Sequence, residues 1–327
     1  MTKVLLTVDT ELLGRHHAAG ASWQENLERS YDAAGVGVPY QLEMLGAHGL
    51  KACFFVDPMP ALVYGLDPVK RMVEPILEAG QEVQLHLHPL WATIDEPAGD
   101  RKFELTDFGR EGQRDLIARA RDLLVQAGAP EPIAFRSGSY AVDTNTLRAL
   151  ADLGFRFDSS HNGSHHPWPS ALPLDPGLID PAEAFGIVEV PVTQIATAGG
   201  GFRHFQLCAL SAGEMRAALN HAAAHRHPVV TIVSHSFELA SRDGLRANGL
   251  IKRRFERLCR FLADNRERLP TAHFTQLGDS VEAVASTPLP ARRWREARRM
   301  AEQAWGNACY EGAGPLAQLR ALASART

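Results

Sequence analysis

Hydrophobic and polar residues follow a repeating order along residues 3–276. A stretch with helical spacing is followed by a glycine and then by a short apolar run that ends in a polar residue, as in LGAHGLKACFFVD and LEAGQEVQLHLH. Glycine ends a helix well because it adopts the left-handed conformation without steric cost. A short run that is apolar on both faces is typical of a strand in a parallel sheet. We therefore expect strands at residues 3–9, 51–57, 82–88, 132–136, 155–158, 187–192, 229–235 and 272–276.

Repeated steps of helix and strand predict an α/β fold, a distorted parallel (β/α) barrel of seven or eight strands in a single domain. We assign residues 1–285 to this barrel and residues 286–327 to a C-terminal helical extension. Trp294 and Trp305, with the alanines between them, have helical spacing. The extension is therefore expected to pack on the barrel or to form the contact of a homodimer, and a membrane-surface helix is the less favoured alternative in an acidic chain.

Composition narrows the classes of function. The 327 residues include 34 Lys and Arg, 38 Asp and Glu and 14 His, for a net charge of -4 with histidine neutral. This balance argues against a nucleic-acid-binding surface, which normally has a basic excess. The four cysteines are scattered, no segment is long enough for a membrane span, and the first apolar run is too short for a signal peptide. We expect a cytoplasmic protein that acts on a small molecule or a saccharide.

Ionisable residues recur at the ends of the predicted strands. In a parallel barrel the carboxyl ends of all strands meet at one rim, where the sites of such barrels lie. An unpaired buried charge costs several kcal/mol, so this convergence indicates a functional site rather than a structural core. The residues concerned are Asp9, Asp57, His86, His88, Arg136, Asp158, Thr193 and His235.

The stretch EVQLHLHPLW places two histidines at the end of one strand. Because side chains alternate between the faces of a strand, His86 and His88 share a face, and Pro89 ends the strand. In TVDTE, Asp9 and Glu11 share a face if the strand continues. Imidazole and carboxylate groups are ligands of zinc-type ions. We predict a metal site that uses both histidines and one of the two acids, while the other acid acts as a base.

Five short motifs, TVDTE, QLHLHP, FRSGSY, DSS and IVSHS, resemble in order and approximate spacing those of the NodB-like polysaccharide deacetylases. The resemblance spans residues 3–280. It implies a hydrolase that removes an N-acetyl group from a sugar and depends on a divalent metal, with zinc expected first and cobalt, manganese or nickel as alternatives. Carried over motif by motif, Asp9 resembles the catalytic base, Arg136 the residue that holds this base, His235 the catalytic acid and Asp158 the carboxylate that tunes the acid.

Three departures from the family pattern indicate a divergent subgroup with D-x-E and H-x-H motifs. Thr10 stands where a second aspartate usually follows the base, so the metal carboxylate is Glu11 or the base itself. Leu90 stands where the second histidine usually lies, and His88 takes over that role. Ser139 stands where a proline is usual.

Three aromatic residues are candidates for substrate binding. Tyr140 resembles the family tyrosine whose backbone amide supports the oxyanion, and Trp91 and Trp168 are candidates for stacking on a sugar face. Residues 159–185 and 193–206 follow strands and are candidate substrate walls. Four histidines of these segments are expected in solvated loops or on the surface: His161, His165, His166 and His204.

Two alternatives to the deacetylase stay open. The first is an amidohydrolase on the same scaffold that cleaves a cyclic amide or a formamide without a metal, and metal content separates it from the deacetylase. The second is a non-catalytic carbohydrate-binding protein, which would bind glycans without turnover. The deacetylase is preferred because the base, the arginine and the acid candidates are all present. A nucleotide-linked, lipid-linked or free saccharide suits a cytoplasmic location better than a polymer.

Overall fold

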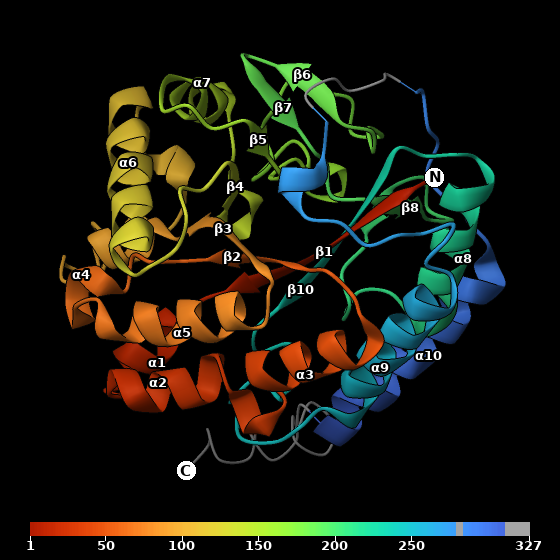
Figure 1. Ribbon diagram of the computed structural model, residues 1–327, viewed down its shortest axis with the longest axis horizontal. Helices are drawn as coiled ribbons and strands as arrows, with labels where there is room; N and C mark the ends of the chain where they lie inside the picture. The colour runs from red at the N-terminus through yellow and green to blue at the C-terminus, as the bar shows by residue number, and fades with distance from the viewer. Residues whose placement is uncertain (279–283, 311–327) are drawn as a thin grey trace, which may run out of the picture.

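An eight-stranded sheet forms the centre of the computed structural model, which describes residues 1–278 and 284–310 (Figure 1). The strand order is β10-β1-β2-β3-β4-β5-β7-β6. Neighbouring strands are parallel except at the edge, where β6 runs antiparallel to β7. The strands are β1 (Lys3–Thr10), β2 (Cys53–Val56), β3 (Glu82–Leu87), β4 (Ala134–Ser137), β5 (Phe157–Asp158), β6 (Ala182–Ala184), β7 (Ile187–Glu189) and β10 (Val229–His235). The predicted distorted parallel (β/α) barrel is confirmed.

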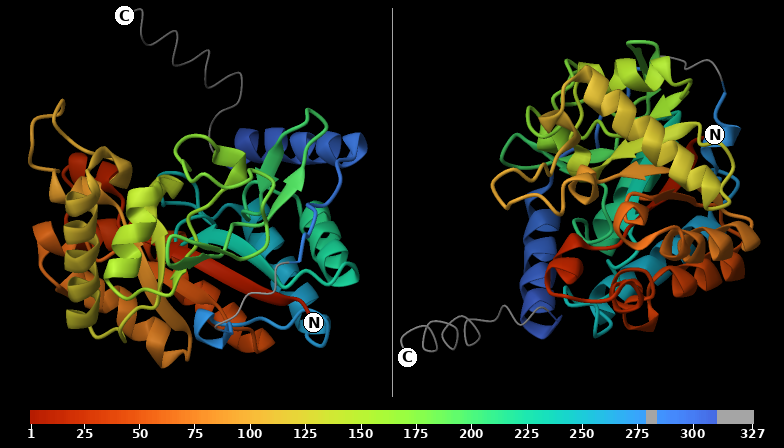
Figure 2. Two further views of the ribbon diagram at one scale, coloured as in Figure 1. Left: turned by 90° about the horizontal axis from the view of Figure 1, so that it is seen from above. Right: turned by 90° about the vertical axis from the view of Figure 1, so that its left-hand side faces the viewer.

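Helices surround this sheet, and Figures 1 and 2 show α6 and α10 on opposite sides of the molecule. The helices are α1 (Gly14–Ala18), α2 (Trp23–Ser30), α3 (Val38–His48), α4 (Ala61–Tyr64), α5 (Asp67–Glu78), α6 (Arg110–Gln126), α7 (Thr144–Asp152), α8 (Ala212–Ala224), α9 (Gly249–Asp264) and α10 (Arg293–Tyr310). Their ends follow the local sequence. Ser211 and Glu214 form a capping box at the start of α8, and Gly49 ends α3 with a φ of 61°.

The strand predicted at residues 272–276 does not form. Residues Phe274–Gln276 are a 3-10 turn instead, and Thr271 makes an isolated bridge to β1. The reason is a tertiary contact, because the Glu82 carboxylate accepts hydrogen bonds from the backbone amides of Phe274 (2.7 Å) and Thr275 (3.0 Å). These amides are therefore unavailable to a strand ladder.

A segment without regular secondary structure lies between β7 and β10 in the wall of the barrel. After β7 the backbone continues to Thr193, whose amide donates to the Thr231 carbonyl on β10 at 3.2 Å. The next residues form a separate hairpin of β8 (Gln194–Ala196) and β9 (Phe202–His204), where we expected a loop. This hairpin lies beside the carboxyl end of β10, since Gln206 makes an isolated bridge with Val233.

Alternation along β1 separates the core from the site. Leu6 and Val8 belong to the large apolar cluster between sheet and helices, whereas Leu5 packs inside the barrel with Phe55 and Phe157. Thr7 and Asp9 share the inward face with Leu5 because they are two and four residues further along the strand. The inside of the barrel thus changes from apolar to polar toward the carboxyl ends of the strands.

The C-terminal helix α10 packs against α8 and α9. Arg299 pairs with Glu214 of α8 at 3.3 Å, and Glu302 pairs with Arg254 of α9 at 3.3 Å. Residues 311–327 of the predicted extension lie outside the described residues. Within the described part of the chain, the helices are all too short or too polar to cross a membrane.

Candidate active site

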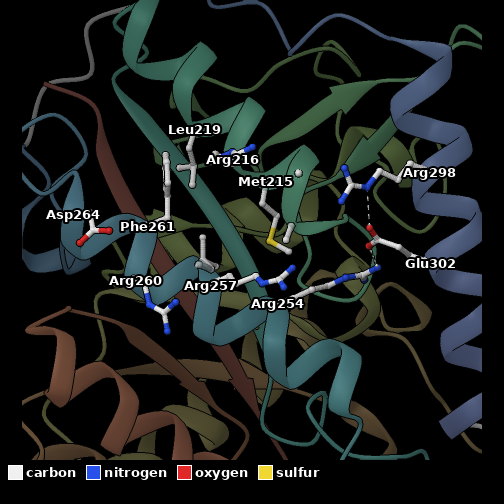
Figure 3. A pocket seen from close by; sticks show the side chains of 13 residues that line it. Met215, Arg216, Leu219, Arg254, Arg257, Arg260, Phe261, Asp264, Arg298 and Glu302 are labelled. Atoms are coloured by element: carbon white, nitrogen blue, oxygen red, sulfur yellow. Dashed lines mark hydrogen bonds and ion pairs between the residues drawn. The ribbon is translucent and has the colours of Figure 1, made fainter.

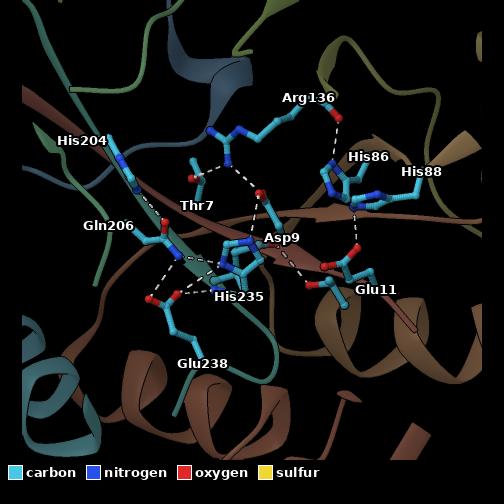
Figure 4. Close-up of polar contacts among 12 residues, drawn as sticks. Thr7, Asp9, Glu11, His86, His88, Arg136, His204, Gln206, His235 and Glu238 are labelled. Carbon is cyan, nitrogen blue, oxygen red and sulfur yellow. Dashed lines mark hydrogen bonds and ion pairs between the residues drawn. The ribbon is translucent and has the colours of Figure 1, made fainter. Parts of the chain in front are cut away.

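Strand register places the predicted site residues in two neighbouring pairs. Asp9 lies opposite His235 across β1 and β10, and His86 lies opposite Arg136 across β3 and β4. The curvature of the sheet then joins the two pairs across the barrel (Figure 4). The Arg136 Nη1 and Asp9 Oδ1 atoms are 2.7 Å apart, although β2 and β3 separate their strands.

Arg136 is fully buried and fixes the position of Asp9. Its Nη1 also donates to the Thr7 hydroxyl at 2.7 Å, and its Nε and Nη2 donate to the carbonyl and hydroxyl of Ser159 at 3.0 and 2.9 Å. The guanidinium carbon lies 4.4 Å from the Phe55 ring centroid. Burial by itself raises the pKa of Asp9, but Arg136 and nearby histidines outweigh it and hold that pKa below its usual value. Asp9 is thus kept ionised, as a base requires.

Glu11, His86 and His88 form a set of metal-ligand type, with one ligand atom from each within 4.8 Å of the others. His86 Nδ1 donates to the Arg136 carbonyl at 2.7 Å, which leaves Nε2 without a proton and available to an ion. Gly138 gives His88 its space, because a Cβ at that position would overlap the imidazole ring. Two imidazoles and one carboxylate fit a divalent ion of the zinc type.

The charge state of this set in the absence of a metal follows from one close contact. His88 Nε2 lies 2.6 Å from Glu11 Oε2. Burial opposes charge on both groups, but their mutual attraction outweighs it, raising the pKa of His88 to about 9 and lowering that of Glu11 to about 2. Burial lowers the pKa of His86 to about 4. An ion bound here would therefore have to displace the His88 proton.

His235 lies on the other side of Asp9, with 3.9 Å between its Nε2 and Asp9 Oδ2. Its Nδ1 is 3.3 Å from Glu238 Oε2, which also accepts the His235 backbone amide at 2.9 Å. The other oxygen of Glu238 accepts the Cys208 amide at 2.6 Å. Burial lowers the pKa of His235, but Glu238 and Asp9 outweigh this effect and raise it to about 9. His235 is thus kept protonated, as an acid requires.

The carboxylate beside His235 is a correction to the sequence analysis, which assigned this role to Asp158. Asp158 is fully buried and accepts a hydrogen bond from the Ser160 hydroxyl at 2.7 Å. It also forms a buried carboxyl pair with Glu189, in which burial raises both pKa values. Among the contacts of the described residues, none joins Asp158 to His235. The signal for Glu238 was present in IVSHSFE, as an acid three residues after the strand-end histidine.

A second group that the sequence analysis missed lies beside His235. Gln206 Nε2 is 3.2 Å from His235 Nδ1 and 3.3 Å from Glu238 Oε1. Its Oε1 is 2.8 Å from His204 Nε2, and His204 Nδ1 is 2.9 Å from the Ser164 hydroxyl. His204 was expected at the surface, but the β8–β9 hairpin turns it toward the site.

Tyr140 lines the same wall of the site. Its ring centroid is 5.6 Å from that of His165 and 6.2 Å from that of His204. The Tyr140 hydroxyl is buried and has no hydrogen-bond partner among the described residues. His161, also expected in a solvated loop, is fully buried. Residues 159–163 are therefore packed against the barrel, whereas the segment is exposed at Pro167 and Trp168.

The two tryptophans predicted to stack on a sugar differ in their exposure to solvent. Trp91 is only 3% exposed and packs edge-on against His17 and Tyr64, each with a centroid distance of 5.7 Å. This corrects its assignment to substrate binding, because a buried indole offers no face to a sugar. Trp168 is 70% exposed, and its role stays a prediction.

Comparisons with known proteins identify the fold. No protein-family model and no curated protein sequence matches the chain. A Mycobacterium smegmatis protein assigned as a polysaccharide deacetylase is similar over 85% of this chain and 94% of its own, with a TM-score of 0.50 and 18% identity. A family 4 carbohydrate esterase from Streptomyces lividans, solved with acetate, covers 83% and 92%, with a TM-score of 0.43 and 14% identity.

A 4-alpha-glucanotransferase from Thermococcus litoralis is also similar, with a TM-score of 0.51 and 13% identity over 89% of this chain. This chain spans 41% of that protein, which is less than half of its length. The chain thus has the fold of the polysaccharide deacetylases, and at these identities the likeness concerns the fold alone.

Proposed function

We propose that this chain is a hydrolase that removes an N-acetyl group from a saccharide with the help of a divalent metal ion, zinc being the first candidate. One observation carries the proposal: the ionised Asp9 lies between a metal-ligand set and a protonated histidine. Glu11, His86 and His88 would hold the ion. A divalent ion in such a site supplies a more acidic water and polarises the amide carbonyl.

The residues around Asp9 provide the proton transfers of amide hydrolysis. Asp9 accepts the proton of the attacking water because Arg136 keeps its pKa low. His235 donates a proton to the departing amine because Glu238 keeps its pKa high. The surroundings thus push the pKa values of base and acid apart, as the reaction needs. The backbone amide of Tyr140, the group that the family resemblance assigns to the oxyanion, would donate to the substrate carbonyl.

The site argues against glycosyl transfer, the other chemistry associated with this fold by the glucanotransferase. Enzymes that act on glycosidic bonds with two carboxyl groups keep one of them protonated as an acid. Asp9 and Glu11 both have lowered pKa values, so neither is suited to that role. Burial raises the pKa of Asp57 to about 7, but this carboxyl is fully buried and accepts the Met59 amide, so it offers no acid to a substrate. The paired imidazoles beside them are explained by a metal ion and have no part in the two-carboxyl mechanism.

The test compares the parent protein with a His86→Ala, His88→Ala variant, both purified without chelator. Elemental analysis should find about one equivalent of a divalent metal in the parent and little in the variant. Acetate release from N-acetylated mono- and oligosaccharides should be lost together with the metal. A His48→Ala, His225→Ala variant is the matched control, because both histidines lie outside the site, and it should retain metal and activity.

Other outcomes point to the alternatives. A parent that hydrolyses formamides or cyclic amides and takes up no metal on reconstitution would overturn the metal-dependent reading in favour of a metal-free amidohydrolase. Glycan binding with no acetate release by the metal-loaded parent would identify a binding protein.

A further inference from the structure

A cavity of about 380 Å³ lies between α8, α9 and α10, outside the candidate active site. Five arginines line it, Arg216, Arg254, Arg257, Arg260 and Arg298, against two carboxylates. Figure 3 shows these side chains around the space between α9 and α10. The lining has an excess of three positive charges, whereas the whole chain has a net charge of -4. The cluster is therefore a local feature and does not follow from a basic composition.

Arg254 is the residue that distinguishes this cavity from a solvated helix face. It is 2% exposed, and its Nε is buried without a hydrogen-bond partner among the described residues. Its Nη1 donates to the Cys208 carbonyl at 3.0 Å and its Nη2 pairs with Glu302 at 3.3 Å. The chain thus fixes this guanidinium in place, and its charge adds to that of the other arginines in the lining.

The remaining charges leave room for an anion. Glu302 is already shared between Arg254 and Arg298, each at 3.3 Å. Arg216 and Arg257 are exposed and have no ion pair among the described residues. Since Asp264 is the other carboxylate of the lining, the five arginines have only two counter-charges among the residues that line the cavity.

The shape of the cavity favours an elongated ligand. A second cavity of about 290 Å³ adjoins it along α8 and α10, with Arg216 and Arg298 in both linings. Leu219 and Phe261 contribute an apolar part to the first cavity. A volume of this size suits a small molecule, and the planar guanidinium groups match phosphate oxygens in geometry and charge.

We propose that this arginine-lined cavity binds a small molecule that carries a diphosphate group. The exposed arginines of α8 and α9 bind its phosphate oxygens, and the charge of the buried Arg254 adds to their attraction. The site does not depend on the proposed hydrolase activity, because none of its lining residues belongs to the metal set or to the acid and base pairs.

The test is calorimetric titration of the full-length protein with inorganic pyrophosphate at constant ionic strength. Variants of Arg254 are avoided because this residue also holds Cys208 and Glu302. An Arg216→Gln, Arg257→Gln variant should bind pyrophosphate about a hundredfold more weakly, since each of the two charged hydrogen bonds contributes about tenfold in affinity. Arg257→Glu alone should weaken it further by placing a negative charge at the phosphate.

The matched control is Arg119→Gln, Arg253→Gln, which removes the same charge from exposed positions outside the lining. Its affinity should stay within about twofold of the parent. An equal loss in the control would show general electrostatic attraction and overturn the site. No pyrophosphate binding by the parent would overturn it as well. Binding only to phosphatidylcholine vesicles that contain phosphatidic acid would assign the arginines to a lipid surface instead.

Discussion

Two contacts between a histidine and a glutamate flank Asp9, and they differ in what else surrounds them. Glu11 directly follows β1 and His88 directly follows β3, and a second imidazole, His86, converges on the same point. The acid partner of His235 comes from its own turn, three residues later, and is also bound by backbone amides. Around the first contact, three ligand atoms are available to an ion. Around the second contact, backbone amides of the chain already occupy the carboxylate.

This difference shows how the same pair of residue types can serve two purposes. A carboxylate fixed by amides stays with its imidazole and raises the proton affinity of the ring. A carboxylate that lies beside two imidazoles can bind an ion together with them, and the ion then replaces the proton shared by the carboxylate and the imidazole. The role of a histidine in this barrel therefore depends on the further donors that surround its carboxylate partner.

Asp9 between the two contacts should give the largest effect. Asp9→Asn keeps the shape and a hydrogen-bond acceptor for Arg136 but removes the base, so acetate release should fall by about a thousandfold. Metal content should be unchanged because Asp9 is not in the ligand set. Turnover and elemental analysis of the same preparation check both. Loss of the metal in this variant would mean that Asp9 is itself a ligand, and the division of roles would fail.

Glu11→Gln should have the next largest effect, and its cause should be metal loss. Removing the ligand carboxylate is expected to weaken metal affinity by about a hundredfold or more, since even outer-shell changes weaken it by about ten- to a hundredfold. Activity should recover partly when excess metal is added, whereas Asp9→Asn should not recover. Titration with zinc while acetate release is followed separates the two variants. If neither recovers, Glu11 has a role beyond holding the ion.

Glu238→Gln should change the pH dependence of the activity, because Glu238 is the carboxylate partner of His235. The folded-state pKa of His235 is raised to about 9, so an activity that needs the protonated ring persists below that pH and is lost above it. Without the carboxylate, this alkaline limb should move down to the ordinary histidine value of about 6.5, and acetate release at pH 8 should fall about thirtyfold. An unmoved limb in the pH profile of kcat/KM would show that Glu238 does not set the acid.

The parts of the molecule that the sequence predicted best lie at strand ends. The apolar runs before Asp9, His86, Arg136 and His235 indicated strands, and parallel neighbours must bring their ends together. The residues that were missed lie after the strands, where no periodic pattern indicates direction. Gln206 follows a glycine-containing hairpin that was expected to be a loop.

Tertiary contacts explain the remaining differences. The segment 272–276 is apolar enough for a strand, but the side chain of Glu82, far away in the sequence, takes up its amides. Trp91 lies shortly after β3, where the sequence suggested a surface aromatic, yet His17 of α1 and Tyr64 of α4 cover it. Such contacts are made by residues that are distant in the sequence, and the local hydrophobic pattern does not indicate which distant residue will be the neighbour.

Gln206→Ala should have the smallest effect. It tests whether residues beyond Glu238 contribute to the function of His235. It removes a neutral amide that donates to Glu238 Oε1 at 3.3 Å, but Glu238 keeps its bonds to the two backbone amides. One neutral hydrogen bond contributes about 1 kcal/mol, so acetate release should fall about fivefold with little change in the alkaline limb. Gln24→Ala, at an exposed position of α2, is the control. A loss as large as that of Glu238→Gln would mean that the hairpin, and not the turn after β10, sets the acid.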